Sequence, residues 1–231
     1  MIEIHHLSYH YAHQITALEG IDLVVDKGEK IALVGSNGAG KTTLLLHLNG
    51  ILRGAGQVRI NKLDLNEKNL PAIRAAVGMV FQSPDDQLFS ASVSDDVAYG
   101  PMYQGLAREE VERRVSQALV QVGMDGFESR APYHLSLGEK RRVALATVLS
   151  MRPDILAMDE PTAGLDPRGR RESIEMLRTL PQTIIAATHD MELVKTLFSR
   201  MIILNKGRIV YDGATKDAIR NEVLLERNGL I

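Results

Sequence analysis

The stretch that most constrains this chain is an eight-residue loop with the pattern Gly-x-x-x-x-Gly-Lys-Ser/Thr. It reads Gly35-Ser36-Asn37-Gly38-Ala39-Gly40-Lys41-Thr42. An apolar run, Ile31–Val34, precedes it, and a helical run, Thr43–Leu48, follows it. This order predicts a strand, a phosphate-binding loop and a helix whose start carries partial positive charge. We expect Lys41 to contact the terminal phosphates of a nucleotide and Thr42 to offer its hydroxyl to Mg²⁺.

Composition narrows the class of protein. The chain has 231 residues, of which 45% are hydrophobic and 24% charged, with a net charge of −2. This balance predicts a globular chain with a sizeable core and gives no basic excess that would favour nucleic acid. Cysteine is absent, so disulfides are excluded. No apolar run approaches the roughly 20 residues of a membrane helix, and the N-terminus lacks a secretory pattern. We therefore expect a cytosolic protein that serves a membrane only through a partner.

Two kinds of periodicity divide the chain. Alternating and compact apolar runs, typical of strands, occur before residue 82 and again after residue 153. Helical spacing replaces them in between, with helices expected at 108–122 and 137–151. We therefore predict one α/β domain, residues 1–231, in which a sheet core (1–82 and 153–231) carries an inserted helical subdomain (83–152).

Two acids end the apolar strand that begins at Ile155. Asp159 at the carboxyl end of this strand is placed to hold Mg²⁺, directly or through water. Glu160, next along, can polarise an attacking water. Alternatively, the two acids could simply cap a turn, but the phosphate loop upstream favours the chemical role.

The stretch Leu135-Ser136-Leu137-Gly138-Glu139 precedes a second helical run. Ser136 and Glu139 have the spacing of a capping box, which by itself would only start a helix. A helix start with a serine hydroxyl and a glycine is also a site for an anion. The two interpretations are compatible.

This stretch resembles the signature Leu-Ser-Gly-Gly-Gln of the ATP-binding-cassette (ABC) ATPases, from which Leu137 and Glu139 depart. The resemblance covers essentially the whole chain. It implies a P-loop NTPase fold, in which a RecA-like mixed sheet with an N-terminal antiparallel part carries the helical subdomain. It also implies that two copies, expected as a homodimer, face each other head to tail and enclose ATP and Mg²⁺ between them.

The resemblance further assigns roles to single residues. Lys41, Glu160 and His189 would be the catalytic residues. The residues implied to bind ATP are Tyr11, which would stack on adenine, the loop residues Gly35, Ser36, Asn37, Gly38, Ala39, Gly40, Lys41 and Thr42, and then Thr43 and Gln82. Mg²⁺ would be held by Thr42, Gln82 and Asp159. The second copy would contribute Ser136, Gly138, Glu139 and Asp166. Ala163 stands where the family usually has a serine.

The region after Gln82 is similar to the ATPases of energy-coupling-factor importers. The resemblance implies a transmembrane coupling protein, a substrate-binding membrane protein and a place on the cytoplasmic face of the cell membrane. The short C-terminal tail favours a cobalt or nickel importer over a vitamin importer, for example one for biotin. A soluble ABC protein is less favoured, because it would need coiled-coil insertions or tandem cassettes. A non-hydrolysing regulator would be expected to lack Glu160 or His189.

Other patterns have less specific interpretations. Asn61-Lys62-Leu63-Asp64 matches the guanine-recognition pattern of GTPases but lies too soon after the phosphate loop. His5, His6, His10 and His13 could suggest a metal cluster, but adjacent residues of a strand face opposite ways, so His5 and His6 are expected on opposite faces. Arg168, Arg170 and Arg171 are expected to form a solvated helix start, with a role in an interface as the alternative.

Overall fold

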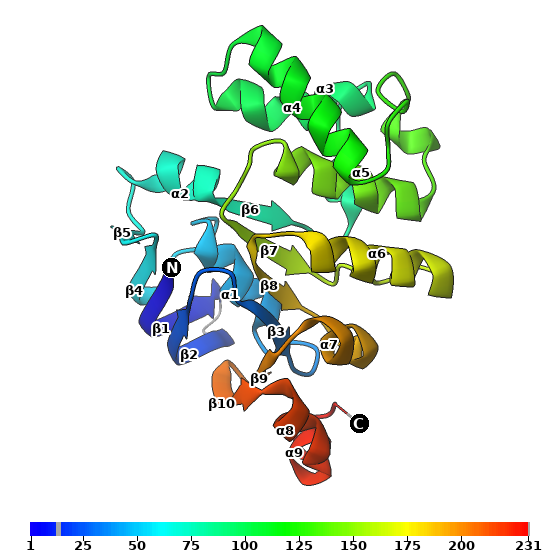
Figure 1. Cartoon of the computed structure of the whole chain (residues 1–231). Coiled ribbons are helices and arrows are strands. Elements are labelled where there is room, and N and C mark those ends of the chain that lie inside the picture. Colours follow the sequence, from blue (N-terminus) through cyan, green and yellow to red (C-terminus); the bar gives the residue numbers. More distant parts are fainter. Residues whose placement is uncertain (13–14, 231) are drawn as a thin grey trace.

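The computed structural model describes residues 1–12 and 15–230 (Figure 1). Within them the strands form two sheets. The antiparallel sheet has the order β2-β1-β4-β5, and the mixed sheet has the order β10-β9-β3-β8-β7-β6. The strands are β1 (Ile2–Tyr11), β2 (Ile15–Val25), β3 (Lys30–Val34), β4 (Ala55–Ile60), β5 (Leu63–Asp64), β6 (Val77–Val80), β7 (Ile155–Asp159), β8 (Thr183–Ala187), β9 (Arg200–Asn205) and β10 (Arg208–Ala214).

The helices lie around these sheets. They are α1 (Lys41–Leu48), α2 (Leu70–Ala76), α3 (Val93–Tyr103), α4 (Arg108–Gln121), α5 (Leu137–Leu149), α6 (Pro167–Thr179), α7 (Met191–Leu197), α8 (Thr215–Arg220) and α9 (Glu222–Arg227). In Figure 1, α3 and α4 form the end of the molecule opposite the C-terminal helices α8 and α9. No helix among the described residues is both long and apolar enough to cross a membrane.

The mixed sheet explains why distant stretches meet. Strand β3 pairs in parallel with β8 and β9, β8 pairs in parallel with β7, and β7 pairs in parallel with β6. Strands β6, β7 and β8 are buried along their whole length, as their continuous apolar runs predict. Because parallel strands end at the same edge, the loops after β3, β6, β7 and β8 lie together there, where α/β sheets bind ligands.

A β-bulge makes one expectation wrong. Strand β1 pairs with β2, but the register shifts between Ile4 and Leu7, and His6 has φ of 51°. Both adjacent histidines therefore approach Asp22: Nδ1 of His5 lies 3.9 Å and Nδ1 of His6 3.2 Å from its carboxylate oxygens. A bulge interrupts the two-residue alternation on which the expectation of opposite faces rested. His13 lies outside the described residues, and those that are described form no group of three or more metal-ligating side chains.

The helices between residues 83 and 152 pack on one another and on the sheet. Helix α4 buries Val111, Val115 and Leu119, the face predicted from their spacing. Helix α5 ends two residues before the predicted Met151. One apolar cluster continues from these helices across a face of the mixed sheet, through Val34 and Met158. The limits 83 and 152 of a helical subdomain therefore stay a prediction.

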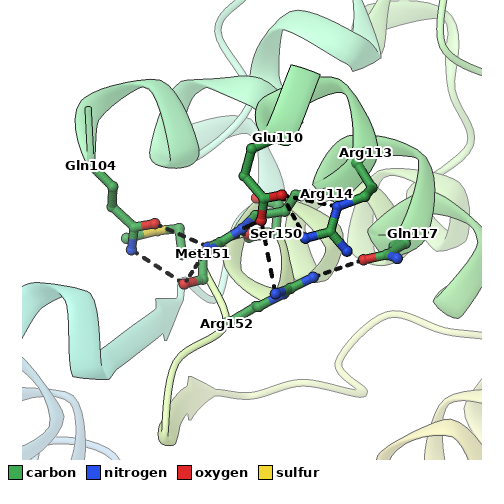
Figure 2. A network of polar contacts seen from close by, with 8 residues as sticks. All are labelled: Gln104, Glu110, Arg113, Arg114, Gln117, Ser150, Met151 and Arg152. Carbon is green, nitrogen blue, oxygen red and sulfur yellow. Dashed lines mark hydrogen bonds and ion pairs between the residues drawn. The ribbon is translucent and has the colours of Figure 1, made fainter. Parts of the chain in front are cut away.

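A polar network fastens α4 to the end of α5 (Figure 2). Glu110 accepts hydrogen bonds from Arg113 and from Nε of Arg114, the latter at 2.7 Å. These bonds, first that from Arg114, lower the pKa of Glu110 to about 2. Arg114 also reaches the carbonyls of Ser150 and Met151, both at 3.4 Å, where α5 has ended. Arg114 therefore satisfies carbonyl groups that a helix end leaves free.

Candidate functional site

A cavity of about 440 Å³ lies beside the phosphate loop. Its lining comes from the end of β1, the start of β2, the end of β7, the loops that follow β3, β6, β7 and β8, and the start of α1. The lining residues are Tyr11, Ile15, Thr16, Ala17, Asn37, Gly38, Ala39, Gly40, Lys41, Thr42, Thr43, Gln82, Asp159, Glu160 and His189. The structure thus brings together the residues predicted for one nucleotide site, except that Gly35 and Ser36 do not line this cavity among the described residues. The sequence did not point to Ile15, Thr16 or Ala17.

The phosphate loop needs its glycines. Gly38 and Gly40 have φ of 78° and 104°, values that favour glycine. A Cβ on Gly40 would also lie 2.4 Å from the carbonyl oxygen of Ala17, so no larger residue fits. Helix α1 starts directly after Gly40, and no side chain caps it. The first N–H groups of α1 are therefore available to an anion in the cavity.

The side chain of Lys41 folds back onto the phosphate loop. Its Nζ donates to the carbonyl oxygens of Gly35 at 2.8 Å and Ser36 at 3.1 Å. Burial lowers the pKa of Lys41, while the charges of Glu160 and Asp159 act in the opposite direction. An ammonium group held only by carbonyls can exchange them for phosphate oxygens, which are stronger partners.

Thr42 and Asp159 meet although 117 positions separate them. The Thr42 hydroxyl donates to Oδ2 of Asp159 at 2.7 Å. Burial raises the pKa of Asp159, because its charge has lost water. A hydroxyl and a carboxylate oxygen this close, with Gln82 lining the same cavity, are the oxygen ligands that suit Mg²⁺.

Glu160 and His189 form the second polar pair of the cavity. Oε1 of Glu160 lies 2.7 Å from Nδ1 of His189 and accepts from the His189 backbone N–H at 3.2 Å. Oε2 of Glu160 accepts from the Thr188 hydroxyl at 3.1 Å. Glu160 is buried, whereas the His189 side chain is 72% exposed. A carboxylate oriented in this way can accept a proton from a water placed between it and a phosphate.

The backbone at Glu160 is unusual. Its φ is 46°, which costs a non-glycine residue on the order of 1–3 kcal/mol and persists only when surrounding contacts impose it. The N–H of Glu160 donates to the carbonyl of Ala187 at 2.8 Å. Its own carbonyl accepts from the Ala163 N–H at 3.2 Å and from Nη1 of Arg141 at 3.0 Å. The sequence assigned no role to Arg141, which follows the signature-like stretch.

Asp190 contacts the loop after β7 that contains Glu160 and Thr162. It caps α7, accepts from the Thr162 hydroxyl at 2.8 Å and bonds to Arg170. Arg170 also lies 3.1 Å from Glu192. The expectation that Arg170 is a solvated residue at a helix start is wrong, because α6 packs beside α7 and turns this side chain inward. Arg168 does point into solvent, with 82% of its side chain exposed.

The predicted capping box is confirmed at the start of α5. Ser136 accepts from the Glu139 N–H, while its own N–H and hydroxyl donate to Oε2 of Glu139 at 2.8 and 2.7 Å. Leu137 packs against Gly164 in the loop that ends at Asp166, which caps α6. Of the residues expected to act from a second copy, Ser136, Gly138, Glu139 and Asp166, none lines the nucleotide cavity of its own chain among the described residues.

The alternative guanine pattern is accounted for by a turn. Asn61 and Lys62, with φ of 51° and 68°, connect β4 to β5. Asn61 donates to Asp154 at 2.8 Å, and Asp64 accepts from Arg59 at 2.6 Å. These residues do not line the cavity beside the phosphate loop among those described.

Comparisons with known proteins agree with this geometry. Residues 18–163 match the family model described as ABC transporter. A putative ABC transporter ATP-binding protein of Geobacter sulfurreducens is 51% identical over 226 residues, which cover 97% of this chain and 91% of the relative. The energy-coupling factor transporter ATP-binding protein EcfA of Methanothermobacter thermautotrophicus is 47% identical over 236 residues, covering 100% of this chain and 76% of the relative.

Solved structures lead to the same family. CbiO1 of Clostridium perfringens, part of the ABC transporter complex CbiONQ, superposes with a TM-score of 0.86 at 36% identity, covering 99% of this chain and 94% of that one. The ATP-binding cassette MJ0796, as a dimer bound to ADP and Pi, superposes with a TM-score of 0.84 at 25% identity, covering 93% and 99%. The predicted fold, a P-loop NTPase with added helices, is confirmed, as is the resemblance to energy-coupling-factor ATPases. The chain therefore belongs to the ABC transporter family and is an ATP-hydrolysing member of it.

Proposed function

We propose that two copies of this chain hydrolyse ATP at shared sites and thereby drive import through a membrane partner. The observation that carries this proposal is the convergence of two pairs, Thr42 with Asp159 and Glu160 with His189, in one cavity beside an uncapped helix start. Such a cavity suits a nucleoside triphosphate. Its N–H groups and the Lys41 ammonium can bind the phosphates, and its oxygen atoms can bind a cation.

The residues divide the chemistry between them. Lys41 and the N–H groups of the loop bind the phosphates, and Tyr11, whose hydroxyl lies 3.1 Å from that of Thr43, borders the position for the base. Thr42, Gln82 and Asp159 would hold Mg²⁺, which when bound neutralises charge on the phosphates. Glu160 takes a proton from the attacking water, and His189 orients Glu160 and contacts the terminal phosphate.

The second half of each site comes from the other copy. Ser136, Gly138, Glu139 and Asp166 lie on one surface, at the starts of α5 and α6, outside their own chain's cavity. Head-to-tail pairing would place that surface over the partner's phosphate loop. The dimeric structure of MJ0796 supports this arrangement. A homodimer would have two complete sites.

A groove beside α3 supports docking of a membrane protein. This cavity of about 330 Å³ is lined by Phe89, Tyr99 and Tyr103, which are 57–73% exposed, and by the buried Asp96. Oδ1 of Asp96 accepts from two backbone N–H groups, but its Oδ2 has no partner among the described residues. An apolar groove with one unsatisfied acid suits an amphipathic helix that carries a basic side chain. We propose that a helix of the transmembrane coupling protein binds here.

The groove is connected to the nucleotide site through neighbouring residues, because Phe81 lines the groove and Gln82 lines the nucleotide cavity. Gln87, in its lining, accepts from the backbone N–H of Phe81 at 3.2 Å and donates to the carbonyl of Ala144 at 2.7 Å. Phe81 directly precedes Gln82, and Ala144 lies in α5. Movement of a docked helix would therefore act on Gln82 and on the helix that begins at Ser136.

The names of the relatives support the class of importer but print no cargo. One relative bears the name EcfA, and CbiO1 is part of a complex named CbiONQ. We propose an energy-coupling-factor importer for cobalt or nickel, with this chain on the cytoplasmic face of the membrane beside a coupling protein and a substrate-binding protein. An importer of a vitamin such as biotin is the second candidate, because the EcfA name does not specify a metal. A soluble ABC protein without a membrane partner is a weaker candidate.

The chemical roles are tested by Glu160→Gln. We expect turnover of ATP to fall by about 100- to 1,000-fold, the contribution of a positioned base, while ATP binding and ATP-dependent dimer formation persist. Phosphate release and size-exclusion chromatography with ATP and Mg²⁺ measure the two properties. Full turnover by this variant would remove Glu160 from its proposed role.

The cargo is tested by uptake. We would co-express the chain with its membrane partners and measure ATP-dependent accumulation of Co²⁺, Ni²⁺ and biotin in vesicles, with Lys41→Ala as the inactive control. Accumulation of a metal ion supports the first candidate, and accumulation of biotin alone replaces it with the second. If this chain does not bind to membranes that contain both partners, a transport role is contradicted altogether.

A further inference from the structure

We propose that Arg141 is a positioning residue that holds Glu160 in its active conformation. This inference rests on the proposed role of Glu160 as the base. Arg141 lies in α5, five residues after Ser136, and its Nη1 donates to the carbonyl oxygen of Glu160 at 3.0 Å. It therefore acts on the backbone of Glu160 and leaves the carboxylate free.

The backbone of Glu160 needs such a contact. With φ of 46°, Glu160 has a conformation that L side chains seldom adopt. This conformation directs the carboxylate toward His189 Nδ1 at 2.7 Å and the Thr188 hydroxyl at 3.1 Å. In an ordinary extended or helical conformation, the same side chain would leave those partners. The contacts of the Glu160 carbonyl, from Arg141 and from the Ala163 N–H at 3.2 Å, therefore also affect where its carboxylate points.

Arg141 differs from its neighbours on α5. Lys140 ends on the carboxylate of Asp85 at 2.6 Å, and Arg142 ends on that of Glu172 at 3.2 Å. The guanidinium of Arg141 instead bonds to a carbonyl, and its buried Nε has no partner among the described residues. A partly buried cation without a carboxylate partner is costly for stability. Such a cost is typical of a residue that has a role in the site.

The surroundings of Arg141 restrict its position. It lines a narrow crevice with Phe81, Pro84, Met158 and Pro161, between α5, α6 and the loops after β6 and β7. The helix that presents Ser136 to the second copy thus also contacts this chain's own Glu160. A shift of α5 during dimer closure would be transmitted to the base through Arg141.

The test compares Arg141→Met with Arg141→Lys in the full chain. Methionine keeps much of the apolar volume but has no donor, so we expect kcat for ATP to fall by about 10- to 100-fold, with KM within about threefold. Lysine can still donate to the Glu160 carbonyl and should recover at least about a third of kcat. The matched control is Lys140→Met, the next residue on the helix, which should stay within about twofold of the unaltered chain. Circular dichroism and thermal unfolding verify that each variant is folded.

A double variant separates positioning from a general structural effect. If Arg141 acts through Glu160, adding Arg141→Met to Glu160→Gln should lower the residual turnover by less than about twofold. An equal fall in both backgrounds would overturn the proposal, as would an unchanged kcat in both Arg141 variants or a rise in KM alone. A fully active Glu160→Gln chain would instead contradict the assignment of the base, so the two failures are distinguishable.

Discussion

The two surfaces expected to enclose ATP are both built on the start of a helix, but they are built differently. At the phosphate loop, α1 begins after Gly40 with no side-chain cap, and charged side chains converge on the open N–H groups. At the second surface, α5 begins with a complete capping box in which Ser136 and Glu139 satisfy each other. The first surface is a cavity within one chain, whereas the second lies outside that cavity.

This difference indicates an order of events. An uncapped helix start leaves N–H groups that only a ligand or water can satisfy, so the phosphate loop is ready to bind an anion in the single chain. The capped start of α5 is satisfied without a ligand, and the Ser136 hydroxyl must leave Glu139 before it can bond to phosphate. We therefore expect the single chain to bind ATP through the phosphate loop and the Ser136 surface to engage only on dimer formation.

The largest expected effect on this comparison of the two surfaces is the loss of ATP affinity and turnover in Lys41→Ala. Removing one charge-assisted contact to phosphate should weaken ATP binding by the single chain about 100-fold and abolish measurable turnover. Fluorescence titration with an ATP analogue, under dilute conditions that keep the chain monomeric, measures this affinity. Unchanged affinity would contradict the nucleotide site.

Ser136→Ala should have a smaller effect that differs in kind. Nucleotide affinity of the single chain should stay within about twofold, whereas ATP-dependent dimerisation of the Glu160→Gln chain should weaken about tenfold, the effect of one lost hydrogen bond. Loss of the cap also costs about 1 kcal/mol of stability. Ser92→Ala is the matched control, because Ser92 caps α3 in the same way and should change stability but not dimerisation.

Mixing the two variants tests whether the second surface acts on the other copy. A Lys41→Ala chain with a Ser136→Ala chain can form one intact shared site, whereas either alone can form none. We expect the mixture to associate with ATP more strongly than either variant alone, measured by energy transfer between labelled chains. Equal association in all three samples would show that the two surfaces do not meet across a dimer.

The smallest expected effect is that of Asp159→Asn. Unlike the substitutions above, it should raise the stability of the ligand-free chain. Burial raises the pKa of Asp159 in the folded chain above the ordinary carboxyl value near 3.8. The free energy of unfolding therefore falls as pH rises from 3.8 through the raised pKa, because ionised Asp159 is less stable in the folded chain than in the unfolded chain. The ligand-free variant should therefore melt a few degrees higher at pH 7, and the gain should disappear below the ordinary carboxyl value near 3.8.

The same variant should lose the extra thermal stabilisation that Mg²⁺ adds to ATP. Asp166→Asn is the control for melting without nucleotide only, since asparagine caps a helix as well as aspartate and should leave the ligand-free melting temperature nearly unchanged. A variant of Asp159 that melts lower at pH 7 would mean that its ionised form is stabilised within the fold.

Much of the site was predictable because its motifs are local. The phosphate loop, the acids after β7 and the capping box each depend on residues a few positions apart, and the structure contains them as expected. The predictions for His5 with His6 and for Arg170 failed for a common reason. Each considered one element by itself, whereas a bulge in β1 and the packing of α6 against α7 determined where the side chains point.

By itself the sequence determined the fold class and the chemical groups of the site, because backbone conformation in a glycine loop or at a capped helix follows from nearby residues. Only the tertiary structure decided which of these groups touch. The order of strands in the mixed sheet brings Thr42 to Asp159 across 117 positions and Glu160 to His189 across 29. The packing of α5 against the sheet brings Arg141, to which the sequence assigned no role, to the carbonyl of Glu160. The physical reason is that parallel strands distant in the chain end at one sheet edge, and nothing local to any one of these residues encodes that edge.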